Sequence, residues 1–108
     1  MTQRYLSINE DQSLSITLGS TMFFFHFYPF RKLMYMDIKQ DNEYLVAGKR
    51  VMANQWLIPI YMGEDVGNVR FETYTADGDD YVWWEDFNKK FRLMLYSSNE
   101  IKEMEAVE

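Results

Sequence analysis

The sequence predicts an all-β fold, a small antiparallel β-barrel or β-sandwich of about seven to eight short strands followed by an acidic C-terminal tail. Short apolar runs recur along the chain, some of them alternate with a period of two, and turn-forming residues separate them. We found no convincing long helix in the pattern. We therefore expect a single all-β domain over residues 1–97, and a tail over residues 98–108 that is either helical or disordered.

Four strands are expected in the first half of the chain: Tyr5–Ile8, Ser13–Leu18, Met22–Tyr28 and Leu33–Lys39. The second is the clearest, because apolar and hydroxyl side chains alternate along it. Turns are expected at residues 9–12, 19–20 and 40–42, where Asn, Asp and Gly gather. Pro29 should end the third strand, since it lacks a donor for the ladder.

Four more strands are expected in the second half: Tyr44–Ala47, Gln55–Tyr61, Val69–Thr75 and Phe91–Tyr96. Gly48 should end the first of these, and Pro59 indicates an edge or a bulge within the second. The Asp-Gly pair in residues 76–80 predicts a hairpin. Residues 81–87 fit either an extended loop or a short helical turn.

The segment Met22–Tyr28 is apolar on both sides, because every second side chain of a strand points the same way. One side consists of Phe23, Phe25 and Phe27. The other consists of Met22, Phe24, His26 and Tyr28. One core covers one side only, so the other needs the domain's own second sheet or tail, another subunit, or a ligand. We expect the phenylalanine side to fill the core.

A candidate interface follows from this division of the strand. Met22, Phe24, His26 and Tyr28 include two side chains with polar tips, and tyrosine is enriched at interfaces because its ring can be covered while its hydroxyl stays bonded. We expect this side to face protein partners. Trp83 and Trp84 are the other residues that we assign to an interface.

Composition excludes several classes of protein. Apolar residues make up 47% of the 108 residues, which excludes disorder for the body of the chain, and the absence of cysteine excludes disulfides and thiolate metal sites. The net charge of −6 opposes phosphate binding, and no run reaches the length of a membrane span. We expect protein partners, no nucleic acid, no membrane and synthesis in the cytoplasm.

Few residues suit catalysis or metal binding. His26 is the only histidine, so a nucleophilic triad would require it and a metal site could draw only one imidazole. The acidic loop at residues 76–80 lacks the spacing of an EF-hand, and the adjacent Glu85 and Asp86 would not face each other across a substrate. We expect a packed or interface histidine whose titration could matter to assembly, with no metal, no cofactor and no enzymatic activity.

A resemblance is carried by the order of several strand patterns over residues 3–97. These are a Gln-x-x-x-Ile-x-Leu strand (Gln12, Ile16, Leu18), a strand with Met36, Asp37 and Ile38, a Gly-plus-apolar stretch at Gly48–Leu57, Gly-Asn-Val-Arg-Phe at Gly67–Phe71 and Leu-x-Leu-Tyr at Leu93–Tyr96. In this order the chain resembles the small baseplate plug proteins of contractile-tailed bacteriophages. It departs from their pattern at Trp83, Trp84, Lys89 and Lys90, where a proline-containing acidic turn and a glycine would be expected.

The resemblance implies an all-β structural subunit of the virion, near the axis of the tail baseplate. Such a subunit would contact hub and tail tube proteins within a homo-oligomer or symmetric assembly, and it would catalyse no reaction. The alternative is a small β-barrel that binds a ligand, or a carbohydrate-binding module that uses Trp56, Trp83 and Trp84.

Overall fold

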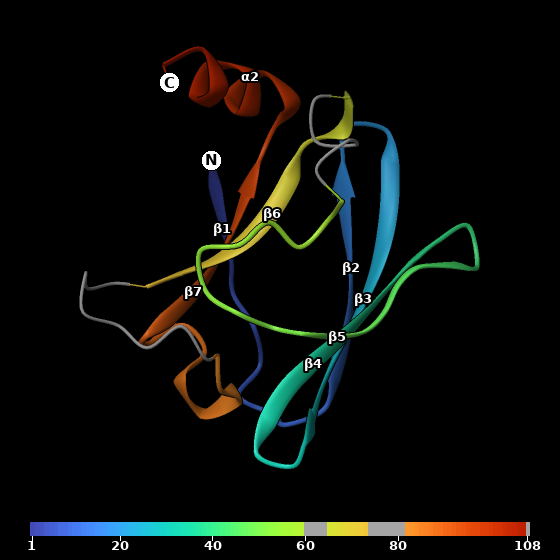
Figure 1. The fold of residues 1–108 in the computed structure, drawn as a ribbon, viewed down its shortest axis with the longest axis vertical. Helices are drawn as coiled ribbons and strands as arrows, with labels where there is room; N and C mark the ends of the chain where they lie inside the picture. Colours follow the sequence, from blue (N-terminus) through green and yellow to red (C-terminus); the bar gives the residue numbers. More distant parts are fainter. Residues whose placement is uncertain (60–64, 74–81, 108) are drawn as a thin grey trace.

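The computed structural model describes residues 1–59, 65–73 and 82–107, and Figure 1 shows their course. In chain order the elements are β1 (Thr2–Arg4), β2 (Gln12–Leu18), β3 (Thr21–Phe30), β4 (Leu33–Gln40), β5 (Glu43–Arg50), β6 (Asn68–Thr73), the 3-10 turn η1 (Trp84–Asp86), β7 (Phe91–Tyr96) and α2 (Ser98–Val107). The strands form two antiparallel sheets, ordered β2-β3-β4-β5 and β1-β7-β6. The sheets do not close into a barrel, so the all-β prediction is confirmed in its sandwich form.

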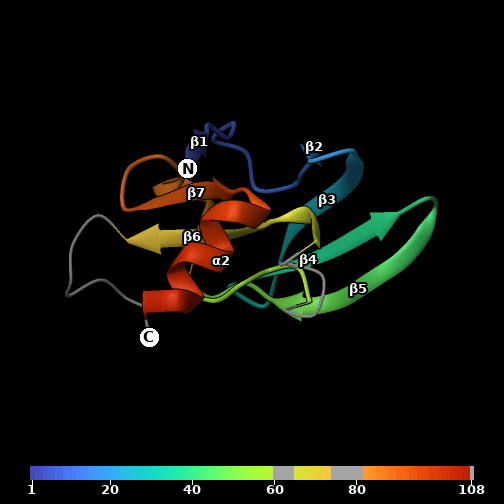
Figure 2. The ribbon, with the colours of Figure 1, turned by 90° about the horizontal axis from the view of Figure 1, so that it is seen from above.

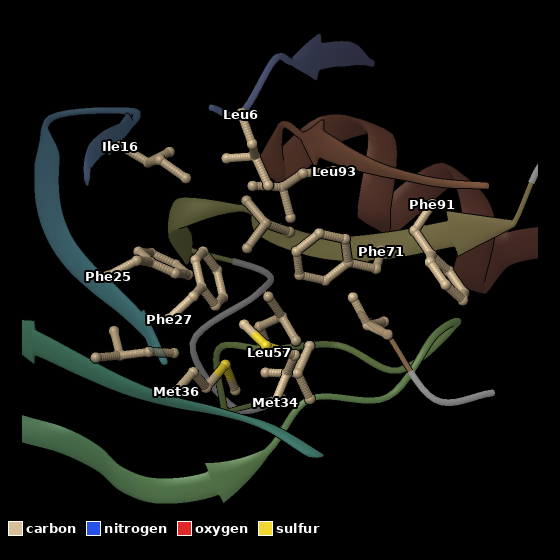
Figure 3. Close-up of a cluster of buried hydrophobic side chains, with 14 of the residues drawn as sticks. Leu6, Ile16, Phe25, Phe27, Met34, Met36, Leu57, Phe71, Phe91 and Leu93 are labelled. Carbon is tan, nitrogen blue, oxygen red and sulfur yellow. The ribbon is translucent and has the colours of Figure 1, made fainter. Parts of the chain in front are cut away.

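The core lies between the two sheets. Phe25, Phe27 and Met36 project inward from β3 and β4, and each is at most 1% exposed. Phe71 and Leu93 meet them from β6 and β7, as Figure 3 shows, and the rings of Phe27 and Phe71 lie 5.5 Å apart in an edge-on arrangement. The period-two alternation of the sequence therefore places one apolar row of each sheet in a shared core.

The first strand lies three residues earlier than predicted, at β1 rather than Tyr5–Ile8. Thr2, Gln3 and Arg4 pair with β7. Leu6 turns into the core instead, and the side-chain amide of Asn88 binds its backbone, accepting from the Leu6 N–H at 3.0 Å and donating to the Leu6 carbonyl at 2.6 Å. A side chain thus supplies the hydrogen bonds that a neighbouring strand would otherwise provide.

Pro29 does not end β3, contrary to the prediction. The strand continues to Phe30, and Pro29 pairs with Met34 of β4. The pairing of β3 with β2 ends at Phe27, opposite Gln12. Pro29 therefore has β4 on one side, and no strand of the described residues pairs with it on the other, which is the edge position that a residue without an N–H tolerates.

Gly48 does not end its strand either, since β5 extends to Arg50. Gly48 has a φ of +64°, and the pairing with β4 shifts register on both sides of Ile38. The Asp37 carboxylate accepts the Gly48 N–H at 2.7 Å, so the irregular peptide keeps a hydrogen bond. Glycine here makes a bulge inside the strand rather than an end.

Residues 55–59 of the predicted strand Gln55–Tyr61 are irregular, and residues 60–61 lie outside the described residues. The segment still runs beside β6, because the N–H of Asn54 donates to Phe71 and that of Leu57 donates to Val69. The side chain of Asn68 binds the backbone of Ile58. Isolated hydrogen bonds and a side-chain clamp replace a regular ladder.

The remaining predictions concern β7 and its connection to β6. The last two residues of the predicted strand Val69–Thr75 and the hairpin at residues 76–80 lie outside the described residues. The helical-turn alternative for residues 81–87 is correct for residues 84–86, which form η1. The final strand, Phe91–Tyr96, has the predicted bounds.

The tail is helical. Ser97 and Glu100 form a capping box, since each backbone N–H donates to the other's side chain, at 3.0 Å from Ser97 and 3.2 Å from Glu100. α2 lies beyond the end of β7 in Figure 1 and in front of β6 and β7 in the view from above in Figure 2. Ile101 is 5% exposed there, in a cluster with Met94 and Tyr96. Among the described residues, no helix is long and apolar enough to cross a membrane.

Candidate interaction surface

The outer side of β3 carries apolar side chains that no part of the described chain covers fully. Met22 is 50% exposed and Phe24 is 49% exposed, whereas Phe23 and Phe25 are buried. The predicted division of this strand into a core side and an open side is therefore what the structure shows. The domain's second sheet lies against the phenylalanine side only.

Aromatic rings continue from this strand onto its neighbour. The His26 and Tyr28 rings lie 4.9 Å apart, Tyr28 stacks on Tyr35 of β4 at 6.2 Å, and Phe30 meets Tyr35 edge-on at 6.1 Å. Tyr44 of β5 is 61% exposed. We call this surface the outer aromatic face, and it consists of Met22, Phe24, His26, Tyr28, Phe30, Tyr35 and Tyr44.

Two carboxylates hold the polar tips of the outer aromatic face. His26 Nε2 lies 2.8 Å from Asp11 Oδ1, and its Nδ1 lies 3.9 Å from Asp37 Oδ2. Asp37 also accepts a hydrogen bond from the Tyr28 hydroxyl at 3.3 Å. Burial and then the neighbouring Asp37 charge raise the pKa of Tyr28. The hydroxyl thus stays protonated as a donor.

A hollow of about 380 Å³ opens on the same face. Its lining mixes aromatic rings with short polar side chains: Ser13, Phe24, Phe25, His26, Asp37, Lys39, Asn42 and Tyr44. The Lys39 ammonium lies 4.5 Å from the centre of the Tyr44 ring, a cation–π distance. Rings, one cation and several hydrogen-bonding groups suit recognition of a protein surface or a small ligand.

The arrangement does not suit general-base catalysis. Ser13 pairs with His26 across β2 and β3. Both ring nitrogens of His26, however, face carboxylates, so neither is directed at a hydroxyl that it would deprotonate. Within residues 1–59, 65–73 and 82–107, three or more metal-ligating side chains do not gather anywhere.

Trp83 and Trp84 lie apart from the outer aromatic face. They flank the start of η1, with ring centres 6.3 Å apart, and both are half-buried against the main core. Phe87, at the end of this turn, packs against Phe27 at 6.5 Å, on the inner side of β3. The structure therefore separates these two parts of the predicted interface by the thickness of a sheet.

Trp56 joins neither group. Its ring meets Tyr96 edge-on at 5.3 Å, and the Arg70 guanidinium lies 4.5 Å from its centre. Arg70 Nε donates to Glu72 at 2.8 Å, and the Tyr96 hydroxyl donates to the same carboxylate. Burial lowers the pKa of Arg70, but the hydrogen bonds with Glu72 and Tyr96 outweigh it and raise the value. The three tryptophans do not form one sugar-stacking platform.

Sequence reasoning missed Phe30, Tyr35 and Tyr44 as members of the outer aromatic face, and it missed Asp37 as the carboxylate beside them. The alternation of β4 already placed Tyr35 and Asp37 on the side opposite Met34 and Met36. That signal identifies the open side of β4, but only the pairing of β3 with β4 brings these residues beside His26 and Tyr28.

Comparison with known families places the chain beside a family of phage proteins. The profile of the family described as "Cyanophage baseplate Pam3 plug gp18" matches residues 3–98, which is nearly the whole chain. No curated protein matches the chain.

Proposed function

Because this chain belongs to the family of cyanophage baseplate plug proteins, we propose that it is the structural plug near the axis of a contractile phage tail, where it contacts the hub and tail tube proteins. The family match over residues 3–98 is the observation that carries this proposal. A baseplate plug is a virion structural protein and associates with other baseplate proteins. The contacts with the hub and tail tube proteins are our addition to what the family match supports.

The outer aromatic face is the surface that we assign to these contacts. Contiguous exposed apolar side chains mark interaction sites on soluble proteins, and aromatic rings dominate the binding energy of interfaces. Phe24 and Tyr44 supply exposed rings, while Asp37 and Lys39 supply charges at the edge of the hollow. Trp83 and Trp84, on the other side of the sheet, would serve a second contact.

The protein acts by assembly and without catalysis. His26, the residue that a nucleophilic mechanism would need, is directed at Asp11 and Asp37. The net charge of −6 favours protein partners over nucleic acid or membrane surfaces. The chain is made in the host cytoplasm and enters the particle as part of a symmetric assembly.

The test begins with the particle. Mass spectrometry of purified tails should detect the chain, and a cryo-EM map of the baseplate should show a two-sheet domain on the tail axis. In parallel, the purified protein is mixed with the hub protein of the same genome, and Phe24→Ala is compared with Lys102→Ala, a change at an exposed residue of α2 that lies outside the outer aromatic face. Absence of the chain from tails would overturn the proposal. Equal binding by both variants would overturn the assignment of the face alone.

A ligand-binding role is the second candidate, and the hollow beside Tyr44 favours it. Its volume of about 380 Å³ is within the range of small-molecule sites, and Asp37, Asn42 and Ser13 offer hydrogen bonds that a sugar uses. Titration of the protein with mono- and disaccharides, followed by NMR, tests this candidate. Shifts confined to the lining residues would support it, and an unchanged spectrum would exclude sugars.

A further inference from the structure

Strand β2 forms an edge of the four-stranded sheet, and this edge is open. All seven of its residues pair with β3 without a register shift, from Gln12 opposite Phe27 to Leu18 opposite Thr21. Among the described residues, β2 receives no backbone hydrogen bond from any other strand. The strand contains no charged residue and no proline. Its outer backbone groups therefore offer a regular ladder to another strand.

The other edges of the two sheets are protected in recognised ways. β5 carries Glu43, Lys49 and Arg50 and has a bulged register against β4. β1 has three residues. The outer side of β6 is occupied by residues 54–58, where Asn54 and Leu57 donate to its backbone and Ile58 donates to the Asn68 side chain. Charges, bulges, short length and coverage are the devices that keep sheet edges from pairing, and within the described part of the chain β2 has none of them.

We propose that β2 pairs with β2 of a second copy of this chain, antiparallel and across a two-fold axis at Ser15. The two four-stranded sheets then join into one sheet of eight strands. This pairing specifies one contact within the symmetric assembly of the proposed function. Only its role in the particle rests on that function, because the pairing itself can occur in the purified protein.

Self-complementarity of the strand argues for a second copy rather than an unrelated partner. With the axis at Ser15, Leu14 lies opposite Ile16 of the second copy and Ser13 lies opposite Thr17. Apolar side chains on the core side thus meet apolar side chains, and hydroxyls on the outer side meet hydroxyls. No like charges oppose each other in this register. A two-fold contact requires such a match of a surface with itself.

The cysteine-free chain allows a direct test of the pairing in purified protein. In Ser15→Cys, the two thiols would face each other across the axis, at the Cα separation of directly opposed residues, about 4.5–5.5 Å, which a disulfide spans. Mild oxidation should give a covalent dimer. Ala47→Cys, an exposed small residue on the β5 edge, is the matched control and should stay monomeric. Equal cross-linking of the two variants, or none with Ser15→Cys, would overturn the proposal.

Sedimentation of the unmodified protein gives the second measurement. We expect a monomer–dimer equilibrium, and Ser15→Lys should weaken it at least about tenfold, because two lysines would face each other in the ladder. Ala47→Lys should leave it unchanged. A protein that is monomeric at every concentration would overturn the edge pairing and leave the baseplate role untouched. A protein that dimerises in solution but is absent from purified tails would overturn the baseplate role and leave the pairing intact.

Discussion

The side-chain amide of Asn68 pairs with the backbone of Ile58 as a neighbouring strand would. Its Oδ1 accepts the Ile58 N–H at 2.9 Å, and its Nδ2 donates to the Ile58 carbonyl at 2.8 Å. Asn68 is 1% exposed, and among the described residues no other polar or charged residue is as fully buried. This clamp fastens the irregular segment that carries Leu57 and Ile58 to the edge of β6.

Replacing Asn68 by alanine should therefore destabilise the fold by about 3 kcal/mol, because buried backbone groups of Ile58 would lose their partners. Urea unfolding measures the change. Asn9→Ala is the control, since Asn9 is exposed, and it should alter the free energy of unfolding by about 0.5 kcal/mol or less. A loss below about 1 kcal/mol for Asn68→Ala would mean that water replaces the clamp.

Phe24 and Phe25 are a matched pair of the same residue type on opposite sides of β3. Phe25 is 1% exposed and Phe24 is 49% exposed. Phe25→Ala should cost about 3–5 kcal/mol of stability. Phe24→Ala should cost about 1 kcal/mol or less but weaken binding to the hub protein by about 2 kcal/mol or more.

Thermal unfolding and sedimentation with the hub protein separate these two effects. Tyr28→Ala tests the same face at its polar end and should behave as Phe24→Ala does. If Phe24→Ala and Phe25→Ala destabilise the monomer equally, the domain itself uses both sides of β3, and the interface assignment fails.

Gly67 should not accept any side chain. Its φ is +101°, and a Cβ at this position would overlap the carbonyl oxygen of Tyr96. Gly67→Ala should cost about 3 kcal/mol or more, since both the backbone and the neighbouring strand would have to shift. Gly19→Ala is the control, because Gly19 also has a positive φ but its Cβ would lie at an ordinary contact distance, 3.9 Å, from the Val66 carbonyl oxygen, and about 1–2 kcal/mol is expected. Equal losses would show that steric overlap with β7 is unimportant.

Stability should fall at alkaline pH through Tyr96. Burial and the hydrogen bond with Glu72 raise the pKa of its hydroxyl above the usual 10.0. A group whose pKa is raised on folding stabilises the protein below its unfolded pKa, and this contribution is lost as the pH rises toward the folded value. The free energy of unfolding should therefore drop between about pH 9 and pH 11, and less so in Tyr96→Phe. Tyr5→Phe, at an exposed site, should keep the wild-type slope. Identical pH dependence of the free energy of unfolding in all three proteins would contradict the assignment of this effect to Tyr96.

Because Ile101 is buried, the C-terminal helix should contribute to the stability of the fold. Ile101 packs on Met94 and Tyr96. Ile101→Ala should lower the free energy of unfolding by about 2 kcal/mol or more, as for other buried isoleucines. Lys102→Ala, at the next and exposed position, should leave it within about 0.5 kcal/mol. Deletion of residues 98–108 should cost at least as much as Ile101→Ala. A deletion without effect would show that the packing of Ile101 adds nothing to stability.

The capping box at Ser97 and Glu100 could have been found in the sequence, because its four-residue spacing is local. The bulge at Gly48 could not, since it depends on Asp37 of the neighbouring strand. The division of β3 into a buried and an open side was predictable from Phe23 to Tyr28. Which rings surround His26 was not, because the register between β3 and β4 sets that neighbourhood.

The sequence by itself determined the all-β class, the order of most strands and the side of β3 that enters the core, because period-two alternation is a local property of an extended chain. The tertiary structure alone decided that Thr2–Arg4 rather than Tyr5–Ile8 pairs with β7, that residues 55–59 stay irregular, and that Trp83 and Trp84 lie away from the outer aromatic face. The first two of these outcomes involve Asn88 and Asn68, whose side chains bind the backbone of Leu6 and Ile58. Such bonds leave no periodic pattern around either partner, so only the folded arrangement reveals them.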